Sequence, residues 1–147
     1  METLIYPIII SFDSSEKERC NVSWYGSHYF LNAFIQENNC QRIMEIGVFN
    51  GDNAITMIKA ALANVAPTAV EYYGFDFFNR SQFIEVQSKL APTMCMFRLY
   101  KGDSTITLPK VLHTLPMMDV IFIDGGKSAT IYPFGVVYGF SSLQKGC

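Results

Sequence analysis

The sequence predicts a doubly wound α/β fold, in which parallel strands alternate with helices. Three observations predict it: short apolar segments alternate with segments of helical period, the connections between them are short, and acidic residues with glycines follow the strand segments. Alternation of this kind joins parallel strands by right-handed crossovers. The expected strands are 42–46, 69–75, 94–100 and 118–123, and the expected helices are 24–36, 52–64, 81–90 and 104–112.

The helices follow from apolar residues at helical spacing and from residues that end a helix. Asn38-Asn39 ends the helix that precedes the first strand, and Pro67 ends the helix over 52–64. The helix over 104–112 is a poor one, because it contains Pro109 and β-branched residues. The strand over 118–123 is apolar at every position of Val120-Ile121-Phe122-Ile123, so we expect a central strand covered on both faces.

The residues after Asp124 suffice for one crossover helix and the start of a further strand. We therefore expect a chain that stops early: a fragment, a truncated product, or a chain completed by a partner. The strand over 118–123 would then be an exposed apolar edge, which is a template for pairing with a second copy or for aggregation. A homo-oligomer formed through this edge is expected on that basis.

Composition and charge exclude several classes of partner. The chain has 147 residues, of which 50% are hydrophobic, and its net charge is −2 without a run of like charges. It therefore has no electrostatic footprint for nucleic acid or for an anionic membrane surface. The apolar run 4–10 contains Pro7 and is far shorter than the roughly 20 residues that span a bilayer, so we expect no signal or anchor.

Residues 1–23 are interpreted as a loosely attached leader, and residues 24–147 as one domain. The cysteines are scattered and form no C-x-x-C pair, which indicates neither a zinc site nor a compact disulfide framework. We expect a reducing, cytoplasmic location. The cysteines are Cys20, Cys40, Cys95 and Cys147.

A glycine turn follows the first strand and opens a helix. Glu45 ends the strand, and Gly47 and Gly51 follow it with Phe49 and Asn50 between them. Such a turn brings backbone N–H groups and a positive helix N-terminus to the carboxyl edge of a parallel sheet, where open α/β folds bind ligands. The alternative is a tight strand–helix turn that binds nothing. The dinucleotide fingerprint G-x-G-x-x-G is not matched, because Phe49 replaces the second glycine and the third is missing.

Acidic residues also follow the next two strands. Asp76 is suited to accept two hydrogen bonds from a ribose diol, or to cap the next helix. Asp103, between Gly102 and Ser104, is suited to accept a proton from an adenine amino group, or to cap the helix that begins near Ser104. Each position is open to both interpretations.

Asp124-Gly125-Gly126-Lys127 follows the fourth strand. An aspartate directly after four apolar residues is costly to bury without a partner, which favours a function for Asp124. Lys127 would act as a base if its pKa were lowered, and the alternative is a solvated lysine paired with Asp124.

Other chemistry-bearing residues are better explained by packing. His28 lies on the apolar face of the first helix, and His113 ends a helix, where a cation suits the dipole. Most aromatic residues are expected in the core. Phe49, Phe77 and Phe78 are exceptions, since they lie at strand ends and could pack on an adenine or a methyl donor.

Taken together, these motifs resemble those of class I S-adenosylmethionine-dependent methyltransferases, in particular the small-molecule O-methyltransferase branch with an Ile-Asp-Gly-Gly signature. The resemblance covers about residues 24–147 and implies a Rossmann-like sheet of strand order 3-2-1-4. The motifs are Glu45-x-Gly47-x-x-x-Gly51, Gly74-Phe75-Asp76, Gly102-Asp103-Ser104 and Phe122-Ile123-Asp124-Gly125-Gly126.

The resemblance implies S-adenosylmethionine as the cofactor and a role for each motif. The loop with Glu45, Gly47 and Gly51 would hold the methionine part, Asp76 the ribose, and Asp103 with Ser104 the adenine. Asp124 would face the sulfonium or a divalent metal, and Lys127 would deprotonate the hydroxyl of a small-molecule acceptor. The residues implied in cofactor binding are Glu45, Gly47, Phe49, Asn50, Gly51, Asp76, Phe77, Gly102, Asp103, Ser104 and Asp124.

By this resemblance, we expect residues 24–147 not to reach the later strands of that fold, and so to lack much of the acceptor pocket that the resemblance implies. Two alternatives to a methyltransferase remain: a Rossmann-type domain that binds NAD or another nucleotide, and a non-catalytic remnant that serves only in interactions.

Overall fold

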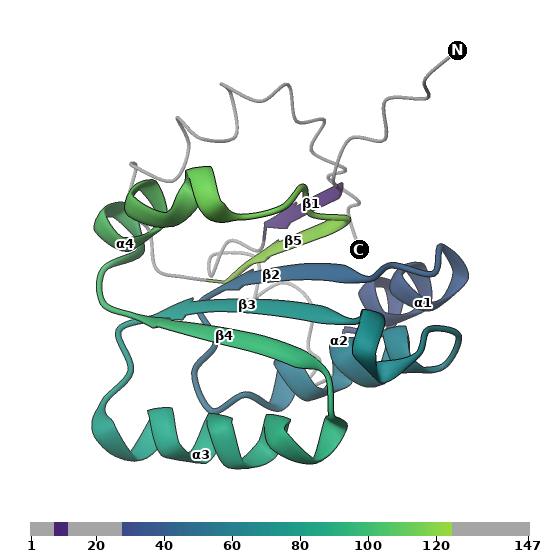
Figure 1. The fold of residues 1–147 in the computed structure, drawn as a ribbon, viewed down its shortest axis with the longest axis horizontal. Coiled ribbons are helices and arrows are strands. Elements are labelled where there is room, and N and C mark those ends of the chain that lie inside the picture. Colours follow the sequence, from purple (N-terminus) through teal and green to yellow (C-terminus); the bar gives the residue numbers. More distant parts are fainter. Residues whose placement is uncertain (1–7, 12–27, 125–147) are drawn as a thin grey trace, which may run out of the picture.

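A computed structural model of the chain describes residues 8–11 and 28–124, which form a parallel sheet flanked by helices (Figure 1). Short 3-10 turns, Pro67–Ala69, Ala91–Thr93 and Leu112–Thr114, connect some of the elements. The strands are β1 (Ile8–Ser11), β2 (Arg42–Ile46), β3 (Glu71–Asp76), β4 (Met96–Lys101) and β5 (Val120–Ile123). The helices are α1 (Tyr29–Glu37), α2 (Asp52–Leu62), α3 (Arg80–Leu90) and α4 (Ser104–Val111).

The strand order is β1-β5-β2-β3-β4, and every neighbouring pair is parallel. Without β1, this order is the predicted 3-2-1-4, because β2, β3, β4 and β5 are the four expected strands in chain order. The predicted doubly wound, Rossmann-like α/β class is therefore confirmed.

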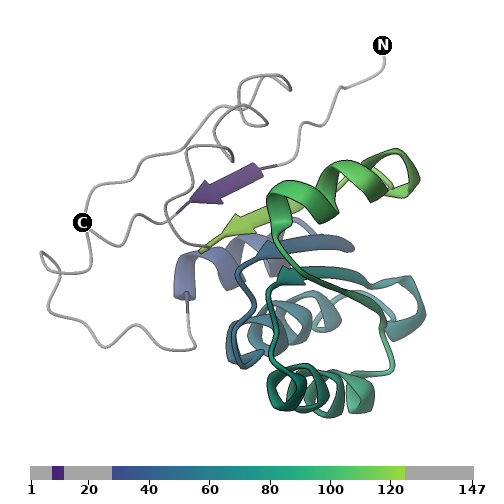
Figure 2. The same cartoon turned by 90° about the vertical axis from the view of Figure 1, so that its left-hand side faces the viewer.

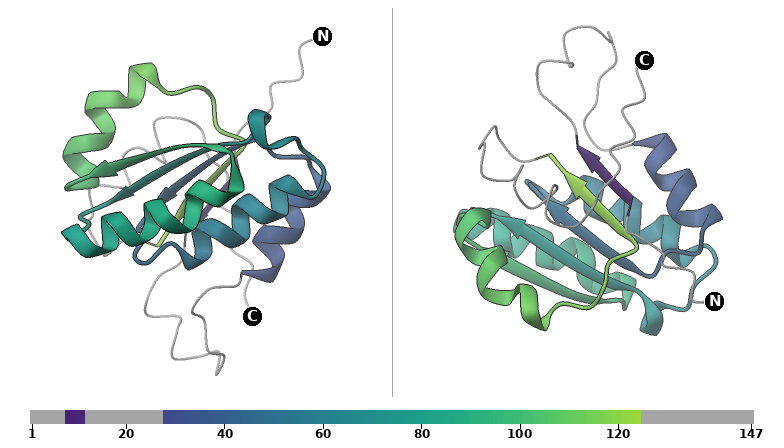
Figure 3. Two further views of the ribbon diagram at one scale, coloured as in Figure 1. Left: turned by 60° about the horizontal axis from the view of Figure 1, so that its bottom comes forward. Right: turned by 90° about the horizontal axis from the view of Figure 1, so that it is seen from above.

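The predicted exposure of the β5 edge is wrong. β1 runs parallel to β5, with Ile8 paired to Val120 and Ser11 paired to Ile123 (Figure 3, right). Residues 8–11 lie in the segment interpreted as a loosely attached leader, yet their backbone is part of the sheet. The boundary between leader and domain at residues 23 and 24 stays a prediction, since residues 12–27 lie outside the described residues.

The sheet has helices on both faces. Helices α1, α2 and α3 pack on one face, and α4 packs on the other (Figure 2). Alternation along the strands decides which side chains meet which helices. In β2, Ile43 joins the cluster beneath α1, α2 and α3, whereas Met44 and Ile46 join Leu108 of α4.

Element ends differ from the prediction by a few residues. β3 begins at Glu71, two residues late, because Pro67–Ala69 form a 3-10 turn. β4 begins at Met96, because Met94 has a left-handed φ of 60° after the turn Ala91–Thr93. The expected first helix includes residues 24–27, which lie outside the described residues.

Candidate functional site

The carboxyl ends of β2, β3, β4 and β5 meet at one edge of the sheet. The register pairs Ile46 of β2 with Phe75 of β3 and with Ile123 of β5, and it pairs Asp76 with Lys101 of β4. Parallel strands in this register bring the loops that follow them to the same side (Figure 1). The predicted site residues therefore lie along one edge.

Backbone hydrogen bonds join these loops to the neighbouring strands. Gly47 N–H donates to the carbonyl of Phe75 at 2.8 Å, and Gly102 N–H donates to the carbonyl of Asp76 at 2.9 Å. The N–H of Asp124 donates to the carbonyl of Ile46 at 2.9 Å. The starts of these three loops are thus held in place by the sheet.

The turn between β2 and α2 depends on three residues with positive φ: Gly47 at 94°, Phe49 at 54° and Gly51 at 81°. A side chain at positive φ is uncommon, so Phe49 adopts a backbone conformation that the surroundings must stabilise. Its N–H donates a 2.7 Å hydrogen bond to Oδ2 of Asp76. The Phe49 ring is 56% exposed, so the turn presents an aromatic surface at the edge.

Asn50 and Asp52 complete this turn. The Asn50 side chain donates to Oδ2 of Asp52 at 2.7 Å, and its Oδ1 accepts from the Asp52 N–H at 3.1 Å. Lys89 of α3 donates to the Asn50 carbonyl at 2.9 Å and to Oδ1 of Asp52 at 2.8 Å. Asn50 therefore shapes the turn, and Lys89 is a contributor that the sequence analysis missed.

Asp76 is half-buried at the end of β3. One of its oxygens holds Phe49, whereas within residues 28–124 its Oδ1 accepts no hydrogen bond. Of the two following aromatic residues, Phe77 is 69% exposed, but Phe78 is buried and packs edge-to-face on Phe83 with ring centroids 5.5 Å apart. The interpretation of Phe78 as a ligand-packing residue is therefore wrong, because its ring is in the core.

Glu45 is 0% exposed and lies beneath the turn. The Tyr72 hydroxyl donates to its Oε2, and Nδ2 of Asn53 donates to its Oε1 at 2.9 Å. The pKa of Glu45 is raised to about 8: burial is the largest cause, the two hydrogen bonds lower the pKa, and the charges of Asp124 and Asp76 contribute to raising it. The three acids lie at the carboxyl ends of neighbouring strands, since β2 pairs with both β3 and β5.

Asp103 caps α4 in the structure. Its Oδ1 accepts from the Thr105 N–H at 2.9 Å and from the Thr105 hydroxyl at 2.7 Å, and these bonds lower its pKa. Gly102 before it has a φ of 131°, and Ser104 is the first residue of the helix. The capping interpretation is thus confirmed, and contact of Asp103 with an adenine stays a prediction.

Asp124 is exposed at the end of β5, and Gly125, Gly126 and Lys127 lie outside the described residues. Across residues 8–11 and 28–124, no three His, Cys, Asp or Glu side chains group in a way that could hold a metal ion. Binding of a metal by Asp124 stays a prediction. In the same part of the chain, no helix combines the length and the apolar character that crossing a membrane requires.

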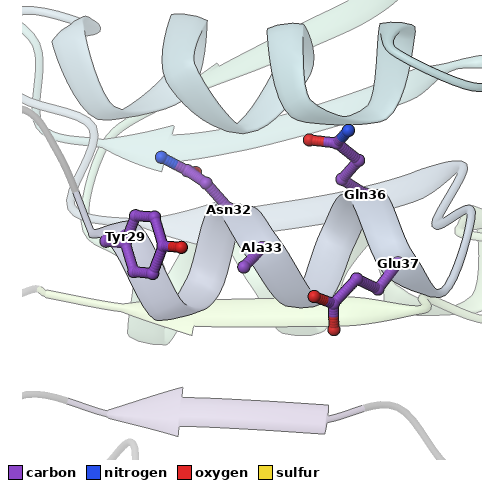
Figure 4. Close-up of a pocket in the computed structure, with 5 residues that line it drawn as sticks. All are labelled: Tyr29, Asn32, Ala33, Gln36 and Glu37. Carbon is purple, nitrogen blue, oxygen red and sulfur yellow. The ribbon is translucent and has the colours of Figure 1, made fainter.

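The two histidines lie in different surroundings. His28 is buried, with its ring centroid 4.8 Å from that of Phe122, and His113 is exposed in the turn Leu112–Thr114. A surface hollow on α1 is not part of the strand edge (Figure 4). It is lined by Tyr29, Asn32, Ala33, Gln36 and Glu37.

Sequence reasoning also missed Tyr72 and Asn53, which hold Glu45. A signal was present, because period-2 alternation puts Tyr72 of β3 on the same face as Glu45 once Glu45 is paired with Gly74. The register that makes this pairing is set by the fold.

No protein-family model matches the chain. No curated protein sequence matches it either. Solved structures do match. The O-methyltransferase TomG from Streptomyces achromogenes, solved with SAM, is 22% identical at a TM-score of 0.56, over 76% of this chain and 49% of that one. The methyltransferase PaMTH1 from Podospora anserina, bound to SAH, is 19% identical at a TM-score of 0.58, over 76% of this chain and 47% of that one.

A third structure, an O-methyltransferase from Bacillus cereus in complex with SAH, is 14% identical at a TM-score of 0.62, over 84% of this chain and 58% of that one. The chain has the class I methyltransferase fold. It spans about half the length of the methyltransferases that it matches.

Proposed function

We propose that this chain is the S-adenosylmethionine-binding part of a methyltransferase that methylates an oxygen of a small molecule. The observation that carries the proposal is the hydrogen bond from Phe49 N–H to Asp76, which fixes the glycine turn beside a strand-end carboxylate. The methyltransferase fold supports the cofactor, since the matched structures were solved with SAM or SAH.

The residues at the edge fit the parts of this cofactor. Oδ1 of Asp76 accepts no hydrogen bond within residues 28–124 and is open to a ribose hydroxyl. Phe49, whose N–H is bonded to Asp76, and Phe77, which follows Asp76 in the chain, are both exposed aromatic residues, which suits contact with an adenine face. The turn Gly47–Gly51 and the N-terminus of α2 would hold the carboxylate of the methionine part.

The remaining roles rest on the carboxylates at the neighbouring strand ends. Asp103 would accept from the adenine amino group, and Asp124 would face the sulfonium cation. When bound, the cofactor supplies the methyl group for an in-line displacement, in which positioning provides most of the acceleration. Glu45 is better assigned to holding the turn than to direct contact, because it is fully buried.

The nature of the methyl acceptor is the second part of the proposal. TomG and the Bacillus cereus protein are named O-methyltransferases, which supports an oxygen acceptor on a small molecule. Lys127 would remove the proton of an acceptor hydroxyl. The alternative role for Asp124, in place of facing the sulfonium, is to help hold a divalent metal. We expect the protein to act in the cytoplasm.

Calorimetry with S-adenosylhomocysteine tests the proposal. The folded wild-type chain should bind it, and Asp76→Ala should lose binding, because the variant removes both the ribose acceptor and the hydrogen bond to Phe49. Glu37→Gln, at an exposed position of α1, is the matched control and should bind as the wild type does.

A thermal-shift comparison separates the alternatives, since a ligand that binds only the native state raises its melting temperature. S-adenosylmethionine should raise it and NAD should not. A shift with NAD alone would favour a nucleotide-binding domain, and a well-folded chain that binds neither would be a remnant without this function.

A further inference from the structure

Glu45 differs from the other acids of the strand edge. Asp76 is half-buried and Asp124 is exposed, whereas Glu45 is completely buried. An isolated buried carboxylate is strongly disfavoured, so such a group takes up a proton unless positive charge compensates it. The charge of Glu45 should therefore depend on what occupies the edge.

Among residues 8–11 and 28–124, the charges that act on the pKa of Glu45 are negative ones. From β3, Tyr72 donates a hydrogen bond to it and Asp76 lies nearby; from β5, Asp124 acts on it, and both aspartates raise its pKa. From α2 it meets the neutral amide of Asn53. On the α1 side, His28 packs on Phe122, the residue paired with Glu45 in the β2–β5 register.

Asn53 can serve either protonation state of Glu45. Its Nδ2 faces Oε1 of Glu45 at 2.9 Å, which suits an ionised carboxylate. Its Oδ1 is buried with no hydrogen-bond partner among the described residues. If the Asn53 side-chain amide turned over, Oδ1 would lose no hydrogen bond. Oδ1 would then face Oε1 of Glu45 and could accept a hydrogen bond from it when Oε1 is protonated. The Tyr72 hydroxyl donates to the other oxygen, Oε2, which can accept whether or not Oε1 carries a proton.

We propose that Glu45 releases its proton when a cation occupies the strand edge, and that this release makes the site favour a cationic ligand over a neutral one of the same shape. The O–H bond of the Glu45 carboxyl breaks and the proton passes to solvent, with no change of oxidation state. The inference rests on the proposed function, because the sulfonium of S-adenosylmethionine is a cation and the thioether of S-adenosylhomocysteine is neutral.

The charges that act on Glu45 give the physical reason. Negative charge at Asp76 and Asp124 raises its pKa, so positive charge placed beside these two carboxylates must lower it by the same electrostatic route. At a pH below the pKa that Glu45 has in the ligand-free protein, Glu45 must ionise when the cation binds. The affinity for the sulfonium ligand should then rise up to about tenfold per pH unit and level off above that pKa, whereas the affinity for the thioether ligand should change little.

Titration calorimetry in buffers of different ionisation enthalpy counts the protons released. At pH 7 the full chain should release about one proton more with S-adenosylmethionine than with S-adenosylhomocysteine. Glu45→Gln imitates the protonated acid and should abolish this difference. Tyr73→Phe is the matched control, since that hydroxyl donates to Glu71 and its ring lies on the α4 face.

A carbon-13 titration of the glutamate carboxyls in the wild type covers the case in which Glu45→Gln fails to fold. The Glu45 signal should report a protonated acid at pH 7 without ligand and an ionised one with S-adenosylmethionine. If both ligands bind with equal proton release, or if the signal does not change, this inference is overturned and the proposed function stands. If neither ligand binds the folded chain, both fall together.

Discussion

The backbone N–H of Phe49 donates a 2.7 Å hydrogen bond to Oδ2 of Asp76 across a separation of 27 residues. One oxygen of Asp76 thus holds a residue of positive φ in the glycine turn, and the other accepts no hydrogen bond within residues 28–124, where we propose that it meets a ligand. The turn and the acid therefore form one unit of the site.

We predict that Asp76→Asn weakens S-adenosylhomocysteine binding about ten- to a hundredfold while leaving the fold intact. The amide oxygen can still accept from Phe49, but the charge is lost, and hydrogen bonds to charged groups are worth about 1.5–3 kcal/mol. Calorimetry gives the affinity, and circular dichroism checks the fold. Unchanged affinity would show that the Asp76 carboxylate does not meet the ligand.

Local patterns were enough to place the strands that build this edge. The sequence predicts strands over 42–46 and 118–123, which the structure has at Arg42–Ile46 and Val120–Ile123, and acids at the ends of these strands mark the edge. The Tyr72–Glu45 contact was not predicted, because it depends on the register between β2 and β3. The pairing of Ile8–Ser11 with β5 was missed for a similar reason, since no local pattern specifies a partner more than a hundred residues away.

Gly74 makes room for the Tyr72 ring, which gives a second prediction. A Cβ at Gly74 would lie 2.9 Å from Cγ2 of Val48, 3.0 Å from Cδ2 of Leu99 and 3.0 Å from Cε1 of Tyr72. Gly74→Ala should therefore overpack the core, lower the free energy of unfolding by about 1–3 kcal/mol and displace the Tyr72 hydroxyl from Glu45. Urea unfolding measures the loss, and Ser88→Ala, at an exposed position of α3, is the control. A stability equal to that of the wild type would contradict this packing.

Glu45 should make the stability of the fold depend on pH. Its pKa is about 8 in the folded state and near 4.5 when unfolded, so the folded state binds more protons between these values. The stability that the protonated form provides is fully present below about pH 4.5 and is lost as the pH rises through about 8. The loss is a few kcal/mol in order of magnitude.

Urea unfolding at pH 6 and pH 9 should thus show a steeper fall in stability for the wild type than for Glu45→Gln. Comparing the free energy of unfolding of the wild type with that of Glu45→Gln at each pH cancels the contributions of the other ionisable groups. Glu85→Gln, which changes an exposed carboxylate, should fall as steeply as the wild type. Parallel pH profiles for Glu45→Gln and the wild type would contradict a raised pKa at Glu45.

Two variants of Asp103 distinguish its capping of α4 from a contact with the cofactor. Asn is as good an N-cap as Asp, so Asp103→Asn should keep the melting temperature while Asp103→Ala lowers it. If the carboxylate also accepts from an adenine amino group, both variants should weaken S-adenosylhomocysteine binding. A thermal melt and a calorimetric titration of each variant test the two roles, and normal binding by Asp103→Asn would leave only the cap.

β1 should protect the edge of β5 from self-association. An edge strand of unpaired N–H and C=O groups templates pairing with another chain, and Ile8–Ser11 cover that edge. In a parallel ladder, alternate residues of a strand donate hydrogen bonds to a given neighbour. One of Ile9 and Ile10 therefore donates to β5, and replacing both by proline removes that hydrogen bond whichever residue makes it. The double variant should elute as larger species in size-exclusion chromatography with light scattering, increasingly so as its concentration rises. The double variant with valine at both positions keeps the N–H groups and should elute as the wild type does, whereas identical elution of the proline variant would show that β1 does not protect the edge.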